Sequence, residues 1–246
     1  MPMEFSQWML LGLAALGIGI TKSGFSGMSM VHVLIFAHIF GARESTGIVL
    51  PLLIAGDIFA MFTYGKHANW SYIRKMLPPA LAGILVGAWV MTWLSPSIYE
   101  PLIGIIIVLL VILQTIRTWK GDWFDRVPHS IGFAWSMGGL AGTTTMLANA
   151  AGPVFGLYLL AIGLPKLEFV GTAAWFFLLI NVIKLPFSWG LGLIRFETLT
   201  MNVLLLPLVA VGLWIGRLLL KRISQRIFDS LILLITAVAA VRLLLL

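Results

Sequence analysis

The sequence predicts an all-α integral membrane protein made of two inverted repeats, each a re-entrant helical hairpin followed by three transmembrane helices. Three observations lead to this fold class: the composition, an internal repeat and the distribution of positive charge. Of the 246 residues, 60 % are hydrophobic and only 10 % are charged. Soluble domains carry about a quarter charged residues, so we expect this chain to use the hydrocarbon of a lipid bilayer as its apolar solvent.

The internal repeat is visible as matched residues at nearly constant spacing. Upstream matches are 124 positions apart and downstream matches are 129 apart, which a length difference in one loop explains. Such self-similarity predicts a duplicated architecture; the alternative is chance similarity between glycine-rich apolar helices. The downstream glycines are expected to allow close helix packing. The matched pairs are Glu44/Glu168, Gly47/Gly171, Asp57/Asn181, Pro78/Pro207, Gly83/Gly212 and Gly87/Gly216.

The repeat divides the chain into a first half, 1–118, a polar cytoplasmic linker, 119–129, and a second half, 130–246. Each half begins with a long apolar segment that small polar residues interrupt, at 5–40 and at 130–164. Three helices are expected after each interrupted segment. They cover 44–65, 73–94 and 98–118 in the first half, and 168–190, 198–220 and 227–246 in the second.

The distribution of Lys and Arg decides how the interrupted segments sit in the membrane. If each segment crosses once, the two sides receive eight and six positive charges, which sets no orientation. If each is a re-entrant hairpin, one side receives eleven and the other three. Because positive loops stay in the cytoplasm, we favour hairpins, with both termini outside a bacterial or archaeal cell membrane. Three crossings per half make the second repeat inverted.

The two hairpin tips are the predicted binding site. Irregular backbone at membrane depth survives only where protein or a watery cavity satisfies it, and the helices that leave the tips present positive dipole ends to an anion. The alternative is that small residues at the tips only permit close packing. The substrate-binding candidates are Lys22, Ser23, Gly24, Ser26, Gly27 and Ser29 at the first tip, Thr143, Thr144, Thr145 and Asn149 at the second, and Asn181 and Lys184 on a later helix.

Three ionisable residues fall inside apolar segments, where such groups are costly and usually functional. Lys22 and Lys184 are candidates to neutralise a bound anion. The alternative for each is a buried ion pair, for instance with Asp57, or snorkelling to the interface. Asp57 is the only carboxylate deep in a predicted span. It is a candidate for proton coupling, so protons are a candidate partner, and its alternative role is to hold a lysine in place.

Several function classes find no support in the sequence. There is no cysteine and no nucleotide-binding glycine loop, and the four histidines are scattered. The sequence therefore predicts no cofactor, no metal site and no ATP-driven transport. An enzyme would need a paired acid and base, and only one deep carboxylate is present. The net charge of +7 fits cytoplasmic loops and lacks the solvated basic face of a nucleic-acid-binding protein.

The pattern resembles the sulfite exporter TauE/SafE family of bacterial and archaeal membrane permeases. The similarity rests on the duplicated architecture, the opening run with Gly17, Gly19, Gly24 and Gly27, and the runs 169–173 and 181–186. It departs from many members at 26–30, where this chain has fewer glycines and no proline. The resemblance implies export of sulfite, an organosulfonate or a related sulfur oxyanion.

Together these interpretations predict a secondary transporter that moves a small anion by alternating access. The residues alone indicate a small anion, and the sulfur comes from the resemblance. The alternatives are an anion channel with the same midplane site, or a permease for a different small carboxylate or sulfur compound.

Overall fold

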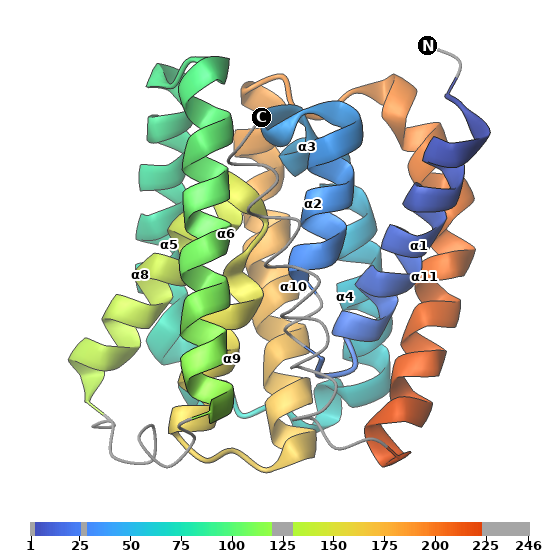
Figure 1. Ribbon diagram of the computed structural model, residues 1–246. Coiled ribbons are helices and arrows are strands. Elements are labelled where there is room, and N and C mark those ends of the chain that lie inside the picture. The colour runs from blue at the N-terminus through green and yellow to red at the C-terminus, as the bar shows by residue number, and fades with distance from the viewer. Residues whose placement is uncertain (1–2, 26–28, 120–129, 223–246) are drawn as a thin grey trace.

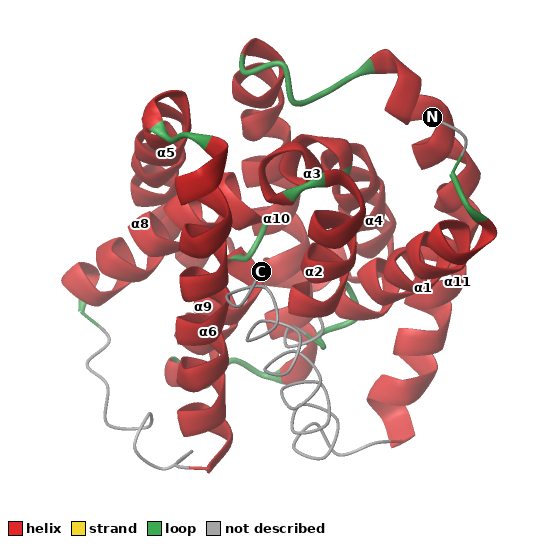
Figure 2. Ribbon diagram, turned by 45° about the horizontal axis from the view of Figure 1, so that its top comes forward, coloured by secondary structure: helices red, strands yellow, loops and turns green. Residues whose placement is uncertain are grey.

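A computed structural model describes residues 3–25, 29–119 and 130–222 of the chain. Within those ranges the protein is helical and contains no strand (Figure 2). Three helices are long and apolar enough to cross a membrane, and a bent helix pair is a fourth candidate. The three are α5 (Trp70–Trp93), α10 (Lys166–Gly190) and α11 (Phe196–Arg222). These features agree with the predicted helical membrane protein. The expected last helix, 227–246, and the linker residues 120–129 lie outside the described residues.

Both interrupted segments fold as two helices separated by a short break. In the first, α1 (Phe5–Thr21) is followed by α2 (Ser29–Phe40), and Gly24 lies between them with a positive φ of 104°. In the second, α8 (Ile131–Ala148) is followed by α9 (Ala151–Ala161), and Asn149 carries the positive φ of 52°. Figure 1 shows the α1–α2 hairpin entering the bundle from the top and the α8–α9 hairpin entering from the bottom.

The first helix after the α1–α2 hairpin is divided where one helix was expected. It consists of α3 (Ala42–Ile48) and α4 (Leu50–Tyr64), which are bent by 42° relative to each other and end in a short 3-10 turn, η2 (Gly65–His67). Pro51 explains the bend, because it has no N–H to donate to the carbonyl four residues earlier. The other long helices are α5 (Trp70–Trp93), α6 (Pro96–Trp119), α10 (Lys166–Gly190) and α11 (Phe196–Arg222).

Glycines allow the first helix of each hairpin to touch a helix of the other sequence half. A Cβ added to Gly19 of α1 would overlap the Val209 carbonyl of α11, and one added to Gly142 of α8 would overlap the Ala80 carbonyl of α5. Gly83 and Gly212, on the opposing helices, meet backbone in the same way. The predicted close packing at these glycines is confirmed, because no larger residue fits between the helices.

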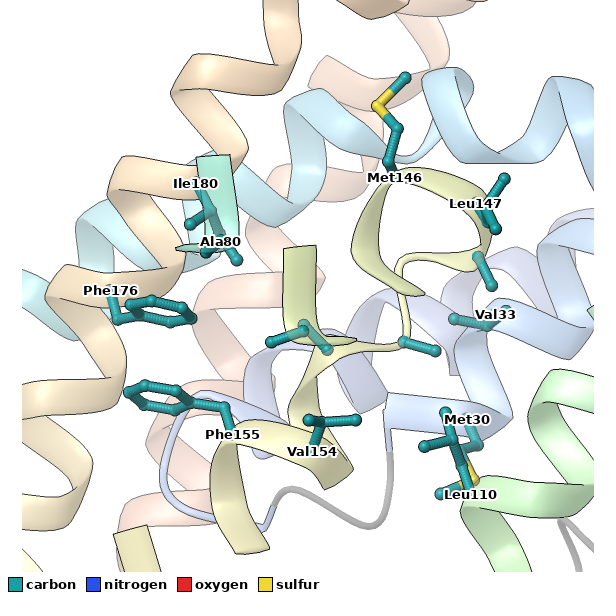
Figure 3. Close-up of a cluster of buried hydrophobic side chains, with 14 of the residues drawn as sticks. Met30, Val33, Ala80, Leu110, Met146, Leu147, Val154, Phe155, Phe176 and Ile180 are labelled. Carbon is teal, nitrogen blue, oxygen red and sulfur yellow. The ribbon is translucent and has the colours of Figure 1, made fainter. Parts of the chain in front are cut away.

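Apolar side chains fill the space between the second hairpin and the neighbouring helices. Figure 3 shows Phe155 of α9 facing Phe176 of α10; their rings are stacked, with centroids 4.0 Å apart and planes within 3°. Met30 and Val33 of α2 belong to the same buried cluster. This packing fixes α9 against α10 and brings both interrupted segments to one place in the bundle.

Candidate functional site

A partly open cavity lies where the two hairpin tips meet. Its volume is about 60 Å³, which is room for roughly four to six water-sized positions, so it suits a small ion rather than a large organic molecule. Both tips, α2, α4, α9 and α10 contribute to its wall. The lining residues are Thr21, Lys22, Gly24, Ser29, His32, Leu53, Thr145, Asn149, Ala151, Gly152, Phe155, Gly156, Phe169, Val170, Ala173, Ala174, Phe177 and Asn181.

The first tip, residues 21–25, brings a positive charge to the cavity and anchors it with a buried carboxylate. Lys22 Nζ lies 2.6 Å from Asp57 Oδ1 on α4, and the Asp57 side chain is fully buried. The other carboxylate oxygen, Oδ2, accepts a hydrogen bond of 2.7 Å from Asn181 Nδ2 on α10. Lys22 Nζ also lies 5.1 Å from the centre of the Phe177 ring, a favourable cation–π distance.

The second tip, residues 148–151, is organised by neutral oxygen atoms around a lysine from another helix. Asn149 adopts the left-handed conformation that asparagine tolerates better than most residues, and its Nδ2 donates to the Thr46 carbonyl of α3 at 2.9 Å. Its Oδ1 accepts from Lys184 Nζ of α10. The same ammonium donates to the Thr145 carbonyl at 2.7 Å and to Thr145 Oγ1 at 3.3 Å.

The first turns of two helices complete the wall of the cavity. Ser29 begins α2, while Ala151 and Gly152 begin α9, and all three residues line the cavity. The first turn of a helix has N–H groups without intrahelical partners and a partial positive charge. Together with Lys22, these two helix starts make an environment that favours a negatively charged ligand.

Comparison with protein-family models agrees with this architecture. The model described as sulfite exporter TauE/SafE matches residues 11–243. The chain belongs to the TauE/SafE family. No curated protein matched this TauE/SafE chain. Family membership and the apolar helices identify a membrane transporter protein of a family associated with sulfite and related sulfur anions.

Six of the predicted site residues of this TauE/SafE protein line the cavity. They are Lys22, Gly24, Ser29, Thr145, Asn149 and Asn181. Lys184 is fully buried one layer behind the wall, where it contacts Thr145 and Asn149. Asp57 likewise lies behind Lys22 and Asn181. Both groups therefore act on the cavity through the side chains that line it.

The remaining predicted residues point elsewhere or lie outside the described ranges. Ser23 Oγ donates to the Leu213 carbonyl of α11 at 3.1 Å. Thr143 Oγ1 donates to the Gly83 carbonyl at 3.2 Å, and Thr144 Oγ1 donates to the Leu140 carbonyl of its own helix at 2.7 Å. The hydroxyls of Ser23 and Thr143 thus join neighbouring helices, as in the alternative role for the tip residues, whereas the bond of Thr144 lies within α8. Ser26 and Gly27 lie outside the described residues.

The sequence reasoning missed His32, which is 2 % exposed and lines the cavity from α2. The four histidines were considered only as possible metal ligands, and they are scattered along the sequence. His32 follows Ser29 by three positions, and residues three apart share one face of a helix. Because Ser29 was already a predicted substrate-binding residue, this spacing could have identified His32.

Proposed function

We propose that this TauE/SafE protein is a secondary transporter that exports a small sulfur oxyanion, such as sulfite or an organosulfonate, by alternating access. The observation that carries the proposal is the cavity at the meeting point of the hairpin tips, with Lys22 and two helix starts in its wall. Transporters of this kind place their substrate site at broken helices near the middle of the membrane.

The local charge balance favours an anion as the ligand. Lys22 and Asp57 form a pair with no net charge, whereas Lys184 contacts only neutral oxygen atoms among the described residues. When Lys184 is protonated, its positive charge has no compensating carboxylate among the groups that it contacts. An anion in the adjacent cavity supplies that compensation, because Coulomb attraction is strong where water is excluded.

Two sets of contacts support the inverted-repeat architecture on which alternating access depends. Asp57 and Asn181, which the sequence repeat matches, are hydrogen-bonded to each other, as expected for counterparts close to a two-fold axis. The contact of Gly19 with Val209 recurs as that of Gly142 with Ala80. We infer that each half is the inverted counterpart of the other.

The placement of basic residues supports an orientation with both termini outside the cell. In Figure 1 the junction of α4 and α5, the start of α10 and the end of α11 lie at the bottom of the bundle. The basic residues of those segments include Lys66, Lys166 and Arg217, so the positive-inside rule assigns that end to the cytoplasm. A periplasmic reporter fused after Leu246 should be active; activity of a cytoplasmic reporter there contradicts the orientation.

Counterflow in proteoliposomes tests the transport proposal. The purified full-length chain is reconstituted, loaded with unlabelled sulfite and exposed to labelled sulfite outside. A carrier gives uptake that internal sulfite stimulates, whereas an anion channel gives flux without such stimulation. Methanesulfonate and acetate, offered in parallel, separate a sulfur oxyanion carrier from a permease for small carboxylates. Absence of any anion flux from a folded, reconstituted protein refutes the proposed function.

A further inference from the structure

We propose that His32 is a specificity-determining residue of the cavity, which hydrogen-bonds the oxyanion and holds the proton that travels with it. The proposal rests on the proposed transport function and adds two features to it: a preference among sulfur oxyanions, and protons as a coupled partner. It concerns a residue that neither the charge pattern nor the repeat pointed to.

The environment of His32 is that of a ligand-binding side chain. The imidazole is 2 % exposed, lines the cavity and has no hydrogen-bond partner at Nδ1 among the described residues. Buried polar atoms nearly always have a partner, and leaving one unpaired costs free energy. A ligand in the cavity that pairs with Nδ1 recovers this free energy, and Ser29 on the same face of α2 lines the wall beside it.

The charges around His32 define what the partner should be. Lys22 of α1 lines the same cavity, and Asp57 of α4 compensates it. Lys184 of α10 lies behind Thr145 and adds one positive charge when it is protonated. A further positive charge on an empty His32 is therefore unfavourable, and the imidazole is neutral until a ligand arrives. With its proton on Nε2, a neutral imidazole presents Nδ1 as a hydrogen-bond acceptor.

An oxyanion with an exchangeable proton fits that acceptor. Hydrogen sulfite donates its proton to Nδ1 in a hydrogen bond, while its negative charge compensates Lys184. If the proton moves across this bond, the products are imidazolium and sulfite dianion. The atoms and the total charge are the same in both forms, so one proton accompanies each sulfite in either case. A sulfonate has no such proton and cannot form this bond to the acceptor nitrogen.

The test compares His32→Leu with His38→Leu, a matched control on the exposed side of the same helix. Leucine is similar in volume to histidine but offers no hydrogen-bond acceptor at the position of Nδ1. Full-length variants are reconstituted in mildly alkaline buffer, where free sulfite is mostly dianionic. Labelled sulfite uptake and the external pH are recorded together, and methanesulfonate uptake is measured as the comparison ligand.

The wild type and His38→Leu should take up sulfite and make the external buffer more alkaline, by about one proton per sulfite. In His32→Leu, we expect sulfite uptake and the accompanying proton uptake to fall together about tenfold, a typical loss for one hydrogen bond to an ion. Methanesulfonate uptake should change by no more than about twofold. His32→Gln and thermal unfolding in detergent identify any loss that comes from misfolding.

The proposal is overturned if folded His32→Leu moves sulfite and protons as the wild type does, or if its sulfite and methanesulfonate uptake fall equally. These results differ from failure of the proposed function, in which the wild type itself moves neither anion. Sulfite uptake by the wild type without any change in external pH also overturns the inference, while leaving the transport function intact.

Discussion

The two hairpin tips face the same cavity but are stabilised by different interactions, an ion pair at the first and hydrogen bonds to neutral oxygens at the second. The first tip carries its own charge, Lys22, and its partner is the buried carboxylate of Asp57. The second tip carries no charge, and Asn149 and Thr145 instead surround the ammonium of Lys184 with neutral oxygens. The first tip should therefore be sensitive to charge balance, and the second should be sensitive to hydrogen-bond geometry.

Removing the carboxylate at the first tip should have the largest effect on stability. Asp57→Ala leaves Lys22 without its ion-pair partner in a largely buried position, and breaking a buried pair from one side costs about 3–5 kcal/mol. We expect a lower thermal unfolding midpoint in detergent and a loss of monodisperse protein. The matched double variant Lys22→Met/Asp57→Ala removes both charges and should recover much of the loss. A double variant as unstable as Asp57→Ala would show that charge imbalance is not the cause.

Removing the lysine behind the second tip should have an intermediate effect on stability and a large effect on transport. Lys184→Ala deletes hydrogen bonds to the Thr145 carbonyl and to Asn149 Oδ1, and each contributes about 1.5–3 kcal/mol. The variant also removes the desolvation cost of a buried ammonium, which offsets part of this loss. The positive charge that balances the anion is lost as well, so anion uptake should be abolished while expression continues. Lys66→Ala, an exposed lysine, is the control. Wild-type uptake by Lys184→Ala would remove Lys184 from the transport mechanism.

The backbone conformation of the second tip should give the smallest effect. Asn149→Ala and Asn149→Gly both lose the hydrogen bonds to Thr46 and Lys184, so the difference between them isolates the cost of the left-handed conformation. Glycine adopts this conformation freely, whereas alanine should be about 1–2 kcal/mol less stable there. Denaturation of the two variants in the same detergent measures the difference. Equal stability would mean that the backbone at 149 relaxes in the variants.

The positions of the breaks and the buried ionisable residues could be predicted because their chemistry is visible in the sequence. Runs of small polar residues and glycines at 21–27 and 142–153 favour an interruption of an apolar helix, and each segment does break within its run, after Thr21 and after Ala148. The ion pair of Lys22 with Asp57 was one of the alternatives considered for these residues, and the structure contains it.

Whether a side chain lines the cavity or lies behind its wall could not be predicted, because this depends on helix rotation and on residues distant in the sequence. Lys184 lies behind the wall because its ammonium group binds Thr145 and Asn149, which are more than 30 positions earlier and line the cavity themselves. Ser23 and Thr143 turn to backbone carbonyls of helices that only the tertiary fold brings close. His32 was overlooked for a related reason: a histidine in an apolar helix forms no recognisable motif until its neighbours in the fold are known.

The glycine contacts of α1 and α8 have a consequence for how the chain is assembled. Because α1 contacts the backbone of α11 and α8 contacts that of α5, the first helix of each sequence half packs tightly against a helix of the other half. If the two helices of either pair slid past each other, their main-chain atoms would overlap, so each pair should move as a rigid unit. Each half expressed alone would lack both of these helix–helix contacts. The two halves should regain a native structure only when they are made in the same cell.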